Sequence, residues 1–175
     1  MFYRPARYPA IACFPLALAL LSISACGFQP RGQTMSLAGV PSPVHISGIA
    51  SFSDLYREIY RQLKIAGARI APTGAESAST LQIAGVEQDA RLLSVNSRNK
   101  AVEYELIEAA TFSLRTANGH ELVAPQRVRV LRIQYRPEIE VLGSGREAEL
   151  LRQDMREELA GRIVRRLTAQ SKATE

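Results

Sequence analysis

The feature that most constrains the fold is a run of alternating side chains from residue 101 to 115, "AVEYELIEAATFSLR". Most of its large apolar side chains stand at even-numbered positions (one parity), whereas Glu103, Glu105 and Arg115 stand at odd-numbered positions (the other parity). Alternation with period two predicts a β-strand with one face on a core and the other partly in water. Glu108 is out of pattern, because it places an acid on the apolar parity.

A hairpin is predicted directly after this strand. Asn118 and Gly119 both tolerate positive φ, so they favour a tight turn into a second strand over residues 121–136. Pro125 in that second strand suits a sheet edge or a bulge. The apolar parity changes near Leu131, which predicts a bulge there or a strand buried on both sides at one end.

Two further segments have an extended pattern. Residues 44–49 alternate Val44 and Ile46 with His45, which predicts a short strand with the imidazole on the opposite face. Residues 79–96 are extended but irregular, and Gly85 marks a predicted bulge. Together with the hairpin they predict a mainly antiparallel sheet.

Two amphipathic helices complete the predicted domain. Ser53 is a good N-cap for a helix that ends at Gly67, and its apolar stripe comprises Leu55, Tyr56, Ile59, Tyr60, Leu63 and Ala66. A longer helix is predicted within residues 141–170, where Ser144 and Glu147 fit a capping box. Its stripe comprises Ala148, Leu151, Met155, Leu159, Ile163 and Leu167.

The order of these elements predicts the fold class. It runs strand, helix, two or three long strands, helix, and each helix has a single apolar stripe that needs a surface to cover. A mainly antiparallel sheet with one apolar face supplies that surface, so an α+β two-layer sandwich is predicted. We expect a single domain over residues 44–170, followed by a flexible tail at 171–175.

The first 25 residues predict a secretory signal peptide. Arg4 and Arg7 form a positive start, and the apolar run that follows is shorter than the roughly 20 residues that span a bilayer. Ile23, Ser24, Ala25 and Cys26 resemble a bacterial lipobox, in which an apolar residue and two small residues precede cysteine, although leucine is the usual first residue. An uncleaved anchor helix is the alternative.

Cys26 is the predicted site of lipid attachment. Cleavage after Ala25 would leave Cys26 as the first residue, with diacylglycerol on its thiol and an acyl chain on its amine. A disulfide is disfavoured because the other cysteine, Cys13, lies in the removed segment. Residues 26–43 are rich in Gly, Pro, Ser and Gln and predict a lipidated tether. Gly27 stands where aspartate favours inner-membrane retention in enterobacteria-like sorting, so a periplasm-facing position on the outer membrane is expected.

Composition and motifs disfavour several classes of protein. The net charge is +5, but the basic residues after Cys26 are mixed with acids, so no nucleic-acid partner is expected. The sequence holds no phosphate loop, dinucleotide fingerprint, G-x-S-x-G elbow or Cys/His metal cluster. We therefore predict neither an enzyme nor catalytic residues, and neither a metal nor a cofactor other than the lipid on Cys26.

Four stretches together resemble one family. They are "CGFQPRG" from Cys26, "RQLKIAG" from Arg61, "AVEYEL" from Ala101 and the closing segment "VLGSGREAELLRQDMREELAGRIVRRL". In this order they are similar to the LPS-assembly lipoprotein family, LptE. The resemblance implies two helices on a four-stranded sheet and an outer-membrane anchor. It also implies a complex with the β-barrel LptD, in which the lipoprotein is a plug that helps to deliver lipopolysaccharide to the outer leaflet.

The resemblance also implies lipopolysaccharide contacts through basic residues. Arg98 and Lys100, in the polar turn "NSRNK", are the candidates in this chain, since cations there suit anionic phosphates. A solvated hairpin turn explains the same residues. Two other functions stay open at this point: a different outer-membrane lipoprotein such as a pilotin-like adaptor, and a lipidated protein that binds a small ligand.

Overall fold

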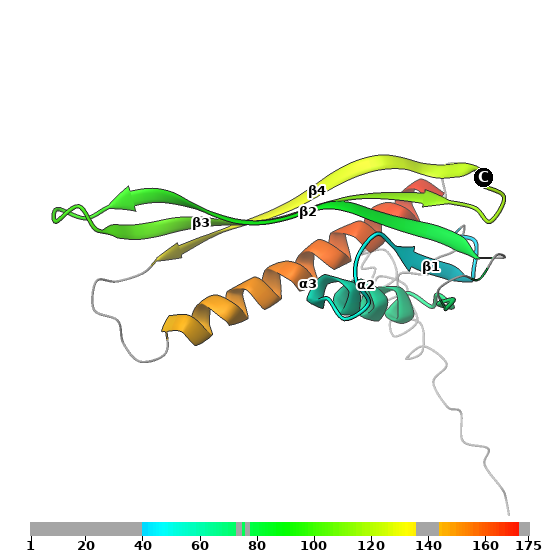
Figure 1. The fold of residues 1–175 in the computed structure, drawn as a ribbon, viewed down its shortest axis with the longest axis horizontal. Helices are drawn as coiled ribbons and strands as arrows, with labels where there is room; N and C mark the ends of the chain where they lie inside the picture. Colours follow the sequence, from blue (N-terminus) through cyan, green and yellow to red (C-terminus); the bar gives the residue numbers. More distant parts are fainter. Residues whose placement is uncertain (1–39, 73–74, 76–77, 136–143, 172–175) are drawn as a thin grey trace, which may run out of the picture. The chain divides into compact units, whose positions relative to one another are not determined.

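A four-stranded sheet covered on one face by two helices forms the domain (Figure 1). The computed structural model describes residues 40–72, 75, 78–135 and 144–171. In chain order the elements are β1 Val44–Ser47, α2 Asp54–Ile65, β2 Ser79–Val95, β3 Ala101–Arg115, β4 Glu121–Tyr135 and α3 Ser144–Ser171. The strands lie in the order β1-β2-β3-β4, with β1 parallel to β2 and the other pairs antiparallel. The predicted fold class is confirmed.

The elements begin and end where local chemistry favours it. The Ser53 hydroxyl accepts a hydrogen bond from the Tyr56 amide at 3.2 Å, which caps α2 as predicted. Gly67 follows the helix with a φ of 87°, a conformation that costs glycine little. Gly119 likewise has a positive φ in the turn between β3 and β4, at the predicted hairpin. The predicted bulge at Gly85 is also confirmed, because the β2–β3 register shifts between Ala84 and Glu87.

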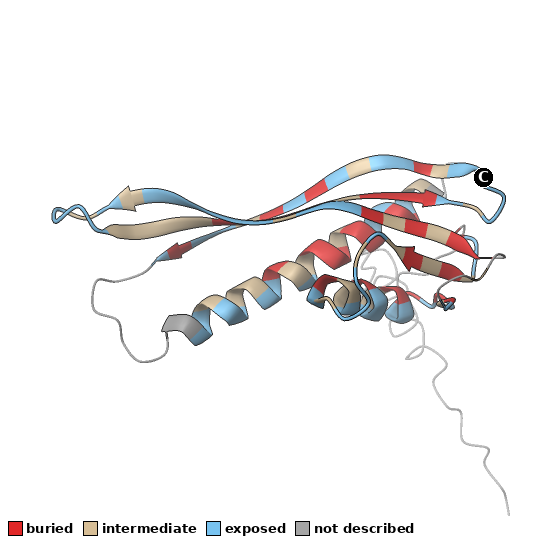
Figure 2. Cartoon of the chain, viewed as in Figure 1, coloured by how far each residue is buried: buried red, intermediate tan, exposed pale blue. Residues whose placement is uncertain are grey.

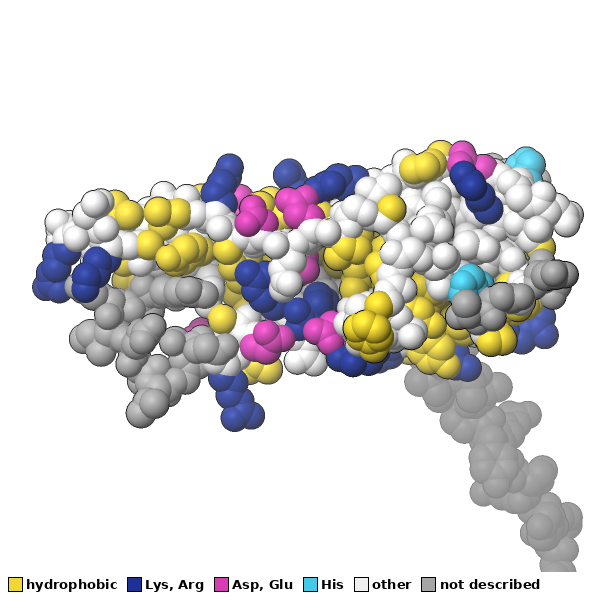
Figure 3. All heavy atoms as spheres, viewed as in Figure 1, with side chains coloured by type: hydrophobic (Ala, Val, Ile, Leu, Met, Phe, Trp, Pro, Cys, Tyr) yellow, Lys and Arg dark blue, Asp and Glu magenta, His cyan; other side chains and the backbone are white. Residues whose placement is uncertain are grey.

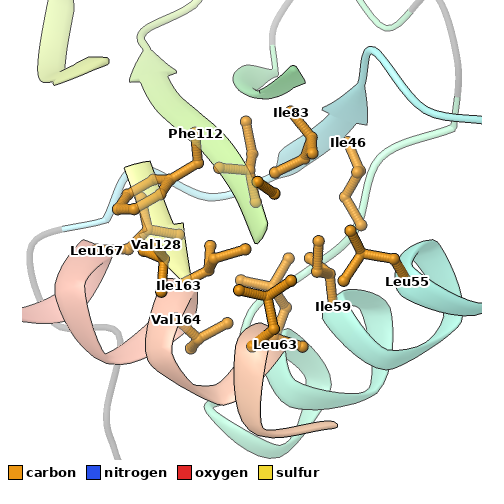
Figure 4. Close-up of a cluster of buried hydrophobic side chains, with 14 of the residues drawn as sticks. Ile46, Leu55, Ile59, Leu63, Ile83, Phe112, Val128, Ile163, Val164 and Leu167 are labelled. Atoms are coloured by element: carbon orange, nitrogen blue, oxygen red, sulfur yellow. The ribbon is translucent and has the colours of Figure 1, made fainter. Parts of the chain in front are cut away.

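The core lies between the helices and the half of the sheet that they cover (Figure 2). Figure 4 shows Phe112 and Val128 of the sheet facing Ile163 and Leu167 of α3. The predicted stripes supply all the buried residues of α2 and half of those of α3, namely Leu55, Ile59, Leu63, Met155, Leu159, Ile163 and Leu167. Ala66, directly after α2, is also buried. Val40, within the predicted tether, is also in this cluster and only 8% exposed.

The prediction for the end of β4 was wrong. Pairing with β3 runs without a shift from Arg127 to Tyr135, so there is no bulge at Leu131. Ile133 and Tyr135 are 66% and 64% exposed, so the strand is not buried on both sides at this end. The register shift in β4 lies instead next to Pro125, between Gln126, which pairs with Phe112, and Val123, which pairs with Leu114. Proline cannot donate a ladder hydrogen bond, so the bulge forms where pairing is already lost.

Arginine side chains donate hydrogen bonds to backbone carbonyls of the edge strand β4. Arg162 of α3 donates to the Arg129 carbonyl at 2.8 Å, and Arg166 donates to the Arg127 carbonyl at 3.3 Å. Arg132 donates to the adjacent Leu131 carbonyl at 2.9 Å. An uncovered edge strand invites pairing with another chain, so these contacts protect the edge as well as attaching α3 to it.

Candidate functional site

The sheet projects beyond the helices at the end formed by the β2–β3 hairpin (Figure 1). Large apolar side chains are exposed on this projecting end, including Leu92, Leu93, Val95, Ile133 and Tyr135. An apolar surface of this kind on a water-exposed domain is typical of an interaction site. We call this region the projecting end and define it as residues 92–105 of the hairpin with residues 133–135 of β4.

The turn at the tip of the projecting end is ordered by Asn96. Its side-chain oxygen accepts hydrogen bonds from the amides of Arg98 and Lys100, at 2.9 and 3.0 Å. The Asn96 amide donates to the Lys100 carbonyl at 2.8 Å, and Asn99 takes a left-handed φ of 61°. This conformation is one that asparagine tolerates better than most residues. The backbone positions of both predicted lipopolysaccharide-binding residues are therefore fixed by one side chain.

Arg98 and Lys100 are both exposed, two residues apart in this turn. Figure 3 shows basic side chains at this end of the domain, whereas acidic ones gather with other basic ones near the middle. The acid nearest to the turn in β3, Glu103, accepts a hydrogen bond from Ser94 at 2.7 Å. The structure thus brings the two predicted cations together beside apolar surface.

The other predicted site residues, Ala25 and Cys26, lie outside the described residues. In the described ranges, none of the helices is long and apolar enough to cross a membrane. Nor do these ranges contain a group of three or more His, Cys, Asp or Glu residues placed to hold a metal ion.

A buried carboxylate attaches α3 to the sheet. Glu108, the acid on the apolar parity of β3, is 3% exposed. It accepts hydrogen bonds from Gln88 of β2 at 3.1 Å and from Arg152 of α3 at 3.3 Å. Burial raises the pKa of Glu108 above the usual 4.5, and the nearby guanidinium of Arg152 opposes that rise. An acid on an apolar parity was the sequence signal for this cluster, but its partner on α3 could not be identified from sequence.

Glu108→Gln is expected to change how stability depends on pH. Because the pKa of Glu108 is raised by folding, the native state binds this proton more tightly than the unfolded state. The resulting stabilisation is complete below pH 4.5 and is lost as the pH rises through the folded pKa. Wild type should therefore gain stability relative to Glu108→Gln as the pH falls from 7 towards 4.5. Urea unfolding at several pH values measures this gain, and a constant difference would contradict it.

Comparison with known proteins identifies the family. The family model described as LptE, lipopolysaccharide-assembly, matches residues 42–167. This range extends from just before β1 to the last turns of α3, so it covers both layers of the fold. The chain belongs to the LptE family. The sequence resemblance is thereby confirmed, and so is the prediction that the chain is not an enzyme, because LptE proteins are lipoproteins of lipopolysaccharide assembly.

Relatives in other bacteria extend the match over most of the chain. The LPS-assembly lipoprotein LptE of Photorhabdus laumondii is 30% identical over 152 residues, which cover 87% of this chain and 82% of the relative. LptE of Yersinia pestis (strain Pestoides F) is 30% identical over 156 residues, covering 87% of this chain and 72% of the relative.

Solved structures share the fold of this LptE protein. A lipoprotein B from Nitrosomonas europaea superposes with a TM-score of 0.65 at 28% identity, covering 84% of this chain and 94% of that one. The rare lipoprotein B from Shewanella oneidensis gives a TM-score of 0.64 at 21% identity, covering 75% and 97%. At that identity the second comparison supports the fold alone.

Proposed function

We propose that this protein is an outer-membrane lipoprotein that forms a plug in the β-barrel LptD and helps to assemble lipopolysaccharide into the outer leaflet. The observation that carries the proposal is the LptE family match over residues 42–167, which includes every strand, α2 and most of α3. A pilotin-like adaptor would be mostly helical, and the three long strands of this domain count against that alternative.

Depletion of the protein tests this function. Cells that lose it should show less lipopolysaccharide at their surface, measured by labelling intact cells, while total lipopolysaccharide is maintained. The protein should also co-purify with a β-barrel in mild detergent. Normal surface labelling after depletion, or recovery of a lone monomer, would favour a different lipoprotein function.

The tip of the projecting end is our proposed contact with lipopolysaccharide. Arg98 and Lys100 are exposed and lie in one turn, directly after the end of β2, where Leu93 and Val95 are also exposed. Lipopolysaccharide combines anionic phosphates with acyl chains, so cations beside apolar surface suit both parts of it. Cys26 is proposed to hold the domain on the periplasmic side of the outer membrane through its lipid.

The double substitution Arg98→Glu with Lys100→Glu should weaken lipopolysaccharide binding about tenfold or more. Each charge-assisted hydrogen bond contributes roughly 1.5–3 kcal/mol, and about 1.4 kcal/mol corresponds to tenfold in affinity. The matched control is Lys64→Glu with Arg129→Glu, which changes the net charge equally at two exposed positions outside the projecting end. Equal weakening by both pairs, or unchanged binding in the first, would reject this contact.

A further inference from the structure

We propose a second binding site, for a phosphorylated sugar, on the outward face of the sheet at the end where β1 lies. Six side chains from three strands form two rows across this face. His45 pairs with Thr80, and Thr80 pairs with Arg115, which makes the first row. The second row comprises Ser47, Gln82 and Ser113, related by the same register. All six point away from the helices, because their neighbours along each strand supply the core.

These rows line a hollow of about 630 Å³, which the turn between β3 and β4 borders on one side. That volume is within the usual range for small-molecule sites. Ser113 is buried on the floor, and Arg115 at the margin is exposed. Neighbouring strands are about 4.8 Å apart, and alternate residues about 7 Å, so the array measures roughly 10 by 7 Å. This area matches a single monosaccharide with one phosphate.

Three polar side chains of the hollow are available for a ligand, whereas Gln82 donates to the Ile83 carbonyl and Thr116 bonds the backbone of His120. Within the described part of the chain, the side chains of Thr80, Ser113 and Arg115 take part in no hydrogen bond or ion pair. The described lining contains no carboxylate; Glu121, which pairs with Arg115 from β4, lies next to the hollow rather than in its lining.

The middle of the same sheet face has a different character. There Arg127 pairs with Glu87, and Arg91 pairs with Glu105 at 2.9 Å, so opposite charges neutralise one another. Figure 3 shows basic and acidic side chains together over the middle of the domain. The β1 end of this face combines uncharged hydroxyls and an amide with Arg115, which forms no ion pair among the described residues, although Glu121 of β4 lies opposite it in register.

This chemistry selects the ligand class. A guanidinium binds phosphate through two parallel hydrogen bonds, and His45 at the other end of the row can add a donor. The hydroxyls of Ser47, Thr80 and Ser113 both donate and accept, as the hydroxyls of a sugar do. The same ligand chemistry occurs in soluble sugar phosphates and in the phosphorylated sugar of a glycolipid. The site does not depend on the function proposed above.

Titration calorimetry of the purified full-length protein in detergent tests the site. Glucose 6-phosphate should bind saturably, and glucose or inorganic phosphate alone should bind at least several-fold more weakly. Arg115→Gln should weaken glucose 6-phosphate binding about tenfold, since it removes a charge-assisted contact. Arg129→Gln is the matched control, because it removes an exposed arginine from the same sheet face outside the hollow.

Three results would overturn the proposal: no saturable binding, equal weakening by Arg115→Gln and Arg129→Gln, or phosphate binding as tightly as glucose 6-phosphate. A lipopolysaccharide capture assay with Arg115→Gln then assigns the source of the ligand. Weaker capture identifies a glycolipid headgroup, and unchanged capture identifies a soluble sugar phosphate. The titration uses isolated protein, so a failure to bind glucose 6-phosphate rejects only this site. Normal surface lipopolysaccharide after depletion would instead reject the proposed function.

Discussion

Cys26→Ser is expected to release most of the protein from the outer membrane into the soluble periplasmic fraction or to leave it as an unprocessed precursor. Serine has no thiol, so it cannot form the thioether with diacylglycerol that the lipobox resemblance predicts. Each buried methylene contributes about 0.8 kcal/mol to membrane binding, and a single acyl chain gives only marginal attachment. Loss of all three predicted chains therefore removes the anchor, and surface lipopolysaccharide should fall as it does on depletion.

Cys13→Ser is the matched control for this prediction. Cys13 lies within the segment that we expect to be removed, so its replacement should leave the location and the mass of the mature protein unchanged. Fractionation followed by mass spectrometry of the N-terminus measures both properties. An uncleaved chain with a free Cys26 thiol in wild type, or full outer-membrane retention of Cys26→Ser, would contradict lipidation.

The fold could be predicted from sequence because its two layers have different periodicities. Alternation over residues 101–115 predicts β3, and stripes at spacings of three and four predict both helices. Local signals at Ser53 and Gly85 also predict a helix start and a bulge that the structure contains. These features depend on neighbours in sequence, which is why a single sequence suffices for them.

Features that depend on distant partners could not be predicted in the same way. The apolar parity change in β4 resembles a change of buried face, yet Gln134 keeps the buried parity of Val128 and Val130, and Ile133 and Tyr135 point to the exposed face of the sheet. Burial of Val40 depends on its position against the domain rather than on its Gly- and Pro-rich surroundings. The two rows of the proposed sugar phosphate site become neighbours only through strand register, which the sequence of each strand alone does not contain.

The pairing of Glu108 with Arg152 shows the boundary between these two kinds of feature. The sequence identified Glu108 as unusual because it places a charge among the apolar positions of β3, and a charge on a buried face needs a partner. The residues are 44 positions apart, so the choice of partner depends on where α3 crosses the sheet. In the same way, the turn that holds Arg98 and Lys100 could be predicted, but not its position beyond the helix layer.

Leu159→Ala is expected to lower the free energy of unfolding by about 2–5 kcal/mol, a large part of the stability of a domain of this size. Leu159 is 1% exposed and lies on the face of α3 that packs in the core. The substitution removes buried apolar surface and leaves a cavity that a sheet and two helices can close only partly. Leu150→Ala makes the same chemical change on the same helix at a side chain that is 55% exposed, so it should cost less than about 1 kcal/mol. Urea unfolding of both variants gives the comparison, and equal losses at the two positions would show that α3 does not present its Leu159 face to the sheet.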